Sequence, residues 1–153
     1  MEQAILDRII ALSNGEKLDY DCTKIWVDLF MEQAREHPEH MAVAAENGSL
    51  SYGELDRLSD QLAAALIDQE GVQPDEFIAV RMGRVKEFHA AVLAIHKAGA
   101  AYMPIDLEYP PERVAYMMED SGARLTLTEQ SVVALLKADC PAKSWNMIVL
   151  KKG

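Results

Sequence analysis

From residue 77 onward, short apolar runs alternate with helical patterns, and this alternation constrains the fold more than any other feature. The apolar runs predict four buried strands, at 77–80, 101–103, 125–128 and 146–150. The patterns between them predict helices at 86–98, 110–120 and 128–138. Strands joined through helices form right-handed crossovers and a parallel sheet. We therefore expect an α/β fold, with a mostly parallel sheet and helices on both faces.

Two helices are expected at the N-terminal end of the chain. Apolar residues at helical spacing predict the first at 2–13, ending before Gly15. Thr23 is the expected N-cap of the second, which carries an apolar stripe and ends at Pro38. The stripe consists of Trp26, Leu29, Phe30 and Ala34.

A hairpin and a third helix follow. Asn47-Gly48 predicts a tight turn between strands at 41–45 and 49–51, because both residue types tolerate positive φ. Ser51 and Glu54 have the spacing of a capping box. The helix that they open has its apolar face at Leu55, Leu58, Leu62, Ala65 and Leu66, and we expect it to close at Gly71. In the later helix at 86–98, the residues expected to face inward are Phe88, Val92 and Ile95.

Charge and cysteine content restrict the possible partners and the compartment. The chain has 15 basic and 25 acidic residues, a net charge of −10 spread along its length. Nucleic acids and anionic membranes require a positive face, so neither is an expected partner. Cys22 and Cys140 are far apart and form no C-x-x-C pair, which favours free thiols in a reducing compartment. The N-terminus lacks a signal-peptide pattern and no apolar run is long enough to span a membrane, so we expect a cytoplasmic protein.

The chemical groups of a complete catalytic site are missing from the pattern. The eight glycines are scattered, without G-x-G or G-K-[ST], so no phosphate-binding loop is predicted. His37 and His40 flank Pro38 in what reads as a solvated turn, with no third metal ligand nearby. His89 and His96 share one helix and favour surface or interface roles. We predict no catalytic, cofactor-binding or metal-binding residue in this chain.

Three segments resemble the nonribosomal peptide synthetase adenylation domains, which are adenylate-forming, AMP-binding enzymes. LSYGEL at 50–55 is similar to their first core motif, and IHKAGAAYMPID at 95–106 is similar to the second. YPPERVAYMMEDSGA at 109–123 resembles the segment that follows, and the resemblance as a whole covers about 23–129. The residues that carry it are Leu50, Ser51, Tyr52, Glu54, Leu55, Lys97, Ala98, Gly99, Ala101, Tyr102, Pro104, Asp106, Tyr109, Pro110, Glu112, Arg113, Asp120, Ser121 and Gly122. His96 and Met103 depart from the usual apolar residue and valine of the second motif.

The resemblance implies a parent enzyme that activates an amino acid for peptide synthesis. Such an enzyme joins an amino acid to AMP from ATP, releases pyrophosphate, and passes the acyl group to a phosphopantetheine thiol on a carrier domain. The implied cofactors are ATP, magnesium and phosphopantetheine, but none of the family's ligands for them has a matching position here. We therefore expect 23–153 to be a truncated N-terminal subdomain that is inactive alone, preceded at 1–22 by a linker or helical arm.

Other interpretations remain open at this point. The motif residues, Lys97–Tyr102 above all, could serve as a non-catalytic docking surface for a small MbtH-like activator protein. Related acyl-CoA synthetases and D-alanine ligases share the fold, and a stand-alone flavodoxin-like module is a further alternative. The expected partners are the remainder of the adenylation domain, the carrier domain and, through exposed apolar surface, a second copy of the chain.

Overall fold

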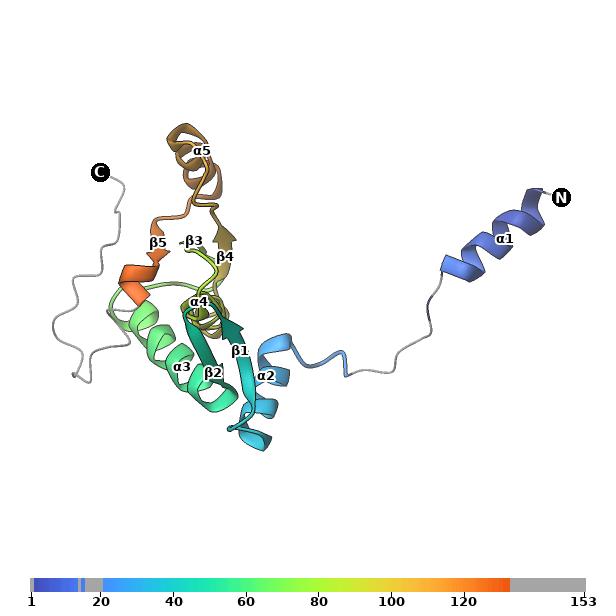
Figure 1. Ribbon diagram of the computed structural model, residues 1–153. Helices are drawn as coiled ribbons and strands as arrows, with labels where there is room; N and C mark the ends of the chain where they lie inside the picture. Colours follow the sequence, from blue (N-terminus) through green and yellow to red (C-terminus); the bar gives the residue numbers. More distant parts are fainter. Residues whose placement is uncertain (1, 14, 16–20, 133–153) are drawn as a thin grey trace.

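The computed structural model describes residues 2–13, 15 and 21–132 (Figure 1). The predicted strand at 146–150 and most of the predicted helix at 128–138 lie outside the described residues. The described elements follow in the order α1 (Glu2–Ser13), α2 (Trp26–Glu36), β1 (Met41–Ala45), β2 (Gly48–Ser51), α3 (Tyr52–Asp68), β3 (Phe77–Arg81), α4 (Lys86–Lys97), β4 (Ala101–Pro104), α5 (Pro111–Ser121) and β5 (Leu125–Thr128).

The three later strands form a parallel sheet in the order β4-β3-β5. Ile78 of β3 pairs with Tyr102 of β4 on one side and with Leu125 of β5 on the other. The connection through α4 leads to one neighbour of β3, and the connection through α5 crosses to the opposite neighbour. Because parallel crossovers share one hand, this reversal of direction requires the two helices to lie on opposite faces of the sheet.

The contacts agree with this arrangement. Ile78, Val80, Leu125 and Leu127 point to one face and join the main core, which also contains buried residues of α3 and α4. On the other face, the Thr126 hydroxyl contacts the Met118 sulfur of α5 at 3.8 Å. α5 has no buried residue, so this face is covered more lightly than the first. The predicted α/β fold with helices on both faces is confirmed.

The hairpin β1–β2 belongs to a second core beside the parallel sheet. The strands pair antiparallel, as predicted, but Ala45 pairs with Gly48, so the two-residue turn is Glu46-Asn47 and not Asn47-Gly48. Of the two predicted turn residues, only Gly48 has a positive φ, at 123°. Apolar residues of α2, the hairpin, α3 and α4 meet in this core: Val27, Val43, Leu50, Leu55, Leu58, Ala90 and Leu93. α3 and α4 therefore serve both cores, and Figure 1 shows the hairpin alongside α3, at the end of the molecule away from α5.

One expectation for α2 is wrong and another holds only in part. Its N-cap is Ile25 instead of Thr23, because the Asp28 carboxylate accepts the Ile25 N–H at 3.0 Å and fixes the first turn there. The buried residues are Val27 and Ala34, whereas Trp26 and Leu29 are about half exposed. Of the predicted stripe, Ala34 is buried and Phe30 packs against the second core, as expected. Trp26 and Leu29 lie beside the covered face, because that face runs through Val27 at helical spacing from Phe30 and Ala34.

The predicted apolar face of α3 is confirmed, since all five of its residues are buried, but the end of α3 and the inward residues of α4 differ from the predictions. α3 ends at Asp68, three residues before the expected Gly71, although Gly71 does adopt a positive φ of 63°. In α4, Ile95 is buried as expected, but Phe88 and Val92 are only partly covered. Besides Ile95, the fully enclosed residues of α4 are the small Ala90, Ala91 and Ala94, which let the helix approach α3 closely.

α1 confirms the predicted N-terminal helix and lies apart from the other elements in Figure 1. Its five large apolar side chains are about half exposed or more: Ile5, Leu6, Ile9, Ile10 and Leu12. None of the helices within the described residues has the length and apolar character needed to cross a membrane.

Candidate functional site

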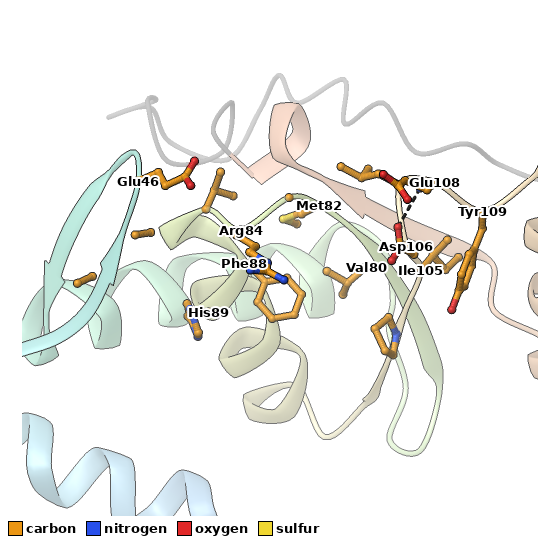
Figure 2. A pocket seen from close by; sticks show the side chains of 16 residues that line it. Glu46, Val80, Met82, Arg84, Phe88, His89, Ile105, Asp106, Glu108 and Tyr109 are labelled. Carbon is orange, nitrogen blue, oxygen red and sulfur yellow. Dashed lines mark hydrogen bonds between the residues drawn. The ribbon is translucent and has the colours of Figure 1, made fainter.

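A hollow of about 1230 Å³ opens at the carboxyl end of β3 and β4 (Figure 2). Three segments surround it: the end of the β1–β2 hairpin, the β3–α4 connection, and the stretch that follows β4. Ligands of parallel α/β sheets bind at the carboxyl ends of the strands, because the loops there converge while the strands fix their starting points. This hollow is therefore the candidate functional site within the described part of the chain.

Hydrogen bonds hold the loops around the hollow in fixed positions. The Ile105 N–H donates to the Val80 carbonyl at 2.9 Å and so extends the pairing between β3 and β4 by one residue. Beyond it, the Arg81 guanidinium donates to the Leu107 carbonyl at 3.1 Å. The Asp106 carboxylate accepts the Glu108 N–H at 2.9 Å, which closes a turn at the rim.

The charges at the rim are mainly negative. Glu46 lies on the hairpin side, while Asp106 and Glu108 lie across the hollow, beside Tyr109 (Figure 2). Arg84 is the cation that lines the hollow, and the neighbouring His89 is exposed. Three carboxylates opposite one guanidinium attract cationic and hydrogen-bond-donating groups more readily than a phosphate chain.

The residues of the first motif form the start of α3. The Ser51 hydroxyl accepts the Glu54 N–H at 3.2 Å, and the Glu54 carboxylate accepts the Ser51 N–H at 2.8 Å, so the predicted capping box is present. Leu50 and Leu55 are buried in the second core. The Tyr52 ring packs against Phe30 of α2, with 5.6 Å between ring centres. This motif therefore builds the scaffold, away from the hollow.

Lys97 of the second motif is enclosed between two helices. Its ammonium group bonds to the Asp56 carboxylate at 2.6 Å and to the Asp60 carboxylate at 2.5 Å, both on α3. It lies 5.9 Å from the centre of the Phe30 ring, and the side chain is only 7% exposed. A group with this little exposure and two acidic partners stabilises the α3–α4 contact. Its charge is not presented to a docking protein.

The rest of the second motif carries the chain from α4 into β4. Ala98 is buried as the C-cap of α4, and Gly99 follows with φ 77°. Any other residue at position 99 would be strained, because side chains disfavour a positive φ of this size. Ala101 is partly covered, while Pro104 and Asp106 reach the hollow.

The third motif places one residue at the hollow and five at the ends of α5. Tyr109 lines the hollow, and the Arg113 guanidinium stacks over its ring at 3.9 Å. The helix-end residues are Pro110 and Glu112 at the start and Asp120, Ser121 and Gly122 at the finish. Gly122 is left-handed with φ 67°, and the Ser121 hydroxyl donates to the Met117 carbonyl at 2.7 Å.

His96 lies in a row of aromatic rings on α2, α4 and β4. Its ring contacts Trp26 edge-on at 5.0 Å and Tyr102 edge-on at 5.6 Å. Burial between them lowers the pKa of His96, because the charged imidazolium would lose hydration there. The row adjoins a smaller apolar hollow of about 360 Å³ that both Trp26 and Tyr102 line.

Sequence reasoning missed Glu46, Arg84 and Glu108 at the large hollow, and it gave Phe88 and His89 only core and surface roles. Their only signal is position, since each follows a strand end or begins the next helix. Within the described ranges 2–13, 15 and 21–132, no cluster of three or more potential ligands is arranged to hold a metal ion.

Comparison with known proteins identifies the family. A family model described as AMP-binding enzyme matches residues 30–152. Gramicidin S synthase 2 of Brevibacillus brevis is 44% identical over 125 residues, which cover 82% of this chain and 3% of that protein.

Solved structures give the same result. An FmoA3 nonribosomal peptide synthetase variant in its AMPPNP-bound form superposes with a TM-score of 0.71 at 33% identity, over 89% of this chain and 14% of that one. Holo-PA1221, a synthetase containing adenylation and PCP domains, superposes with a TM-score of 0.63 at 30% identity, over 67% of this chain and 18% of that one.

The chain spans only a small part of these proteins, between 2% and 11% of the length of the first curated relatives. The resemblance drawn from the three motifs is nonetheless confirmed by both the family match and the fold. The chain belongs to the AMP-binding enzyme family, as an N-terminal portion of a nonribosomal peptide synthetase adenylation domain.

Proposed function

We propose that this chain supplies the scaffold and one wall of the active-site region in an amino-acid-activating adenylation domain. The parent reaction would join an amino acid to AMP from ATP with release of pyrophosphate, and then transfer the aminoacyl group to a phosphopantetheine thiol. The observation that carries the proposal is the family match across 30–152, in a chain whose hollow lies at the carboxyl edge of its parallel sheet.

The residues of this chain do not by themselves fit ATP and magnesium. A triphosphate requires several backbone N–H groups and cations pointed at its oxygens. The sequence offers no glycine-rich loop, and the hollow presents Arg84 among the carboxylates of Glu46, Asp106 and Glu108. We therefore propose that phosphate and magnesium ligands come from other parts of the synthetase, and that this chain alone is inactive.

An exchange assay tests this division of roles. Purified chain is incubated with ATP, labelled pyrophosphate, magnesium and each amino acid in turn, beside an intact adenylation domain as positive control. We expect label in ATP for the intact domain and only background for this chain. Amino-acid-dependent exchange by this chain alone would overturn the proposed division.

The proposed partners are the remainder of the adenylation domain and a carrier domain. Exposed apolar side chains on several elements are consistent with surfaces that another part of a synthetase would cover, among them Trp26, Leu29, Met41, Leu107 and Tyr116. In isolation, the same surfaces would favour self-association. Sedimentation velocity over a hundredfold range of concentration should show growing oligomers. A monomer at every concentration would contradict this expectation.

Docking of a small MbtH-like activator protein is the second candidate function. The observation in its favour is the exposed aromatic row, because Trp and Tyr are enriched at protein interfaces. Trp26 is 47% exposed and Tyr102 is 36% exposed. Binding of an MbtH-like protein should be lost in Trp26→Ala and kept in Tyr116→Ala, a matched exposed aromatic on α5. Equal binding by both variants, or no binding by the parent chain, would refute docking at this row.

A further inference from the structure

The turn of the β1–β2 hairpin is tied to the first turn of α4 by one side chain. The Lys86 N–H donates to the Asn47 Oδ1 at 3.0 Å, and the Asn47 Nδ2 donates to the Glu87 carboxylate at 2.7 Å. These partners are about forty positions away in sequence, on a different structural unit. Within the described part of the chain, both side-chain hydrogen bonds between the hairpin and α4 come from Asn47.

The tie supplies a helix cap from outside the helix. Val85 occupies the N-cap position of α4 and its side chain makes no capping hydrogen bond. The first backbone N–H groups of a helix lack partners within it, and an apolar residue at the N-cap leaves them unsatisfied. The Asn47 carbonyl oxygen accepts one of them, so the hairpin performs the role that a local Ser, Thr or Asp usually has.

The carboxamide is the group that this position requires. It presents one acceptor and one donor from the same carbon, which suits a backbone N–H beside a carboxylate. Alanine has neither group. Aspartate offers only acceptors when ionised, and would place a second negative charge against Glu87.

The Asn47 tie matters for the candidate site because the two elements that it joins, the β1–β2 hairpin and α4, each form one wall of the hollow. Ala44, Ala45 and Glu46 lie immediately before Asn47, and Val85, Phe88 and His89 surround its two partners on α4. Figure 2 shows Glu46 at the end of the hairpin, and Phe88 and His89 on the neighbouring α4. The hairpin is not hydrogen-bonded into the parallel sheet, so its position there depends on packing and on this tie.

We propose that Asn47 is a positioning residue, which locks the hairpin wall of the hollow to α4 and so fixes the width of the opening. The proposal concerns the folded chain itself and does not depend on the proposed activity. Losing the tie should let the hairpin tip move relative to the loops after β3 and β4, while the second core keeps the hairpin attached at its base.

Distance measurement across the hollow tests the proposal. Spin labels are placed at Ala44→Cys and Leu107→Cys, two exposed positions on opposite sides, in a chain carrying Cys22→Ser and Cys140→Ser. Pulsed electron spin resonance should give one narrow distance distribution for this parent. Asn47→Ala should broaden it, and hydrogen exchange at the Lys86 amide should accelerate by about tenfold.

Two further variants make the test specific. Asn47→Asp combined with Glu87→Gln reverses donor and acceptor at the second bond, so the narrow distribution should return. Ser49→Ala, an exposed change in the same hairpin, should leave it unaltered. An unchanged distribution in Asn47→Ala would overturn the proposal. A distribution that is equally broad in the reversed pair would also overturn it, since the tie would then not be the cause.

Discussion

Lys97 provides the sharpest test of how the two shared helices are held together. Its ammonium group is almost fully enclosed, whereas its partners Asp56 and Asp60 are 32% and 64% exposed. Removing the lysine leaves two carboxylates that water can reach. Removing both carboxylates leaves a cation that water reaches poorly, and an unpaired buried charge is the more costly defect.

The magnitudes follow from this asymmetry. Lys97→Met keeps the apolar stem and loses two charge-assisted hydrogen bonds to partly hydrated acids, which should cost about 1–2 kcal/mol. The double variant Asp56→Asn/Asp60→Asn should cost about 3 kcal/mol, toward the lower end for a broken buried ion pair. Asp60→Asn alone should cost well under about 1 kcal/mol, because that carboxylate is the more exposed.

Urea unfolding followed by circular dichroism measures the ranking. With a slope of about 1.5 kcal/mol per molar urea, the midpoint should fall by about 1 M for Lys97→Met and about 2 M for the double variant. Lys86→Met, at the opposite end of the same helix, serves as a matched control and should shift it much less. If Lys97→Met proves as costly as the double variant, or more costly, the asymmetry between buried cation and exposed anions is wrong.

Three further predictions concern caps and burial. Ser51→Ala should destabilise the fold by about 1 kcal/mol and speed amide exchange in the first turn of α3, because the Glu54 N–H loses its acceptor; unchanged exchange would contradict the cap. Gly122→Ala should lower the free energy of unfolding, measured by thermal unfolding, by about 1 kcal/mol, because φ is 67° while a Cβ there would meet no atom within 4 Å. Gly122→Asn should cost less, because Asn tolerates this φ better; equal costs for the two variants would argue against a backbone origin. Burial lowers the pKa of His96 in the folded chain, so as pH falls below 6.5 the unfolded chain takes up a proton at this residue first. The free energy of unfolding should therefore decline with falling pH until the pH is below the pKa of His96 in the folded chain. His96→Phe should remove this part of the pH dependence, and identical pH profiles for the two proteins would refute the burial of His96.

The sequence predicted the repeating pattern of the fold well because that pattern is set by local rules. The strands at 77–80, 101–103 and 125–128 and the Ser51–Glu54 capping box each depend on a few neighbouring residues, and all are present. The predicted hairpin is present too, but its turn is Glu46-Asn47, one residue earlier than expected. The N-cap of α2 was misplaced because an aspartate inside the helix, Asp28, satisfies the preceding backbone and makes Thr23 unnecessary.

The site was harder to predict because it is assembled from distant segments. Glu46, Arg84 and Glu108 have nothing in their local sequence that marks them, and only the strand order brings them together. Lys97 shows the opposite difficulty. Its place in a recognisable motif suggested a docking surface, while its partners on α3, 37 and 41 residues earlier, show that it is enclosed.

Exchange activity of a chimeric enzyme tests the central claim most directly. Residues 30–132 of this chain would replace the matching segment of an adenylation domain whose ATP–pyrophosphate exchange is measured beforehand, with the intact host as control. If this chain is adenylation-domain scaffold without phosphate ligands of its own, the chimera should keep amino-acid-dependent exchange with the amino-acid preference of the host. A chimera that folds, shown by a cooperative unfolding transition, yet gives only background exchange would contradict the claim.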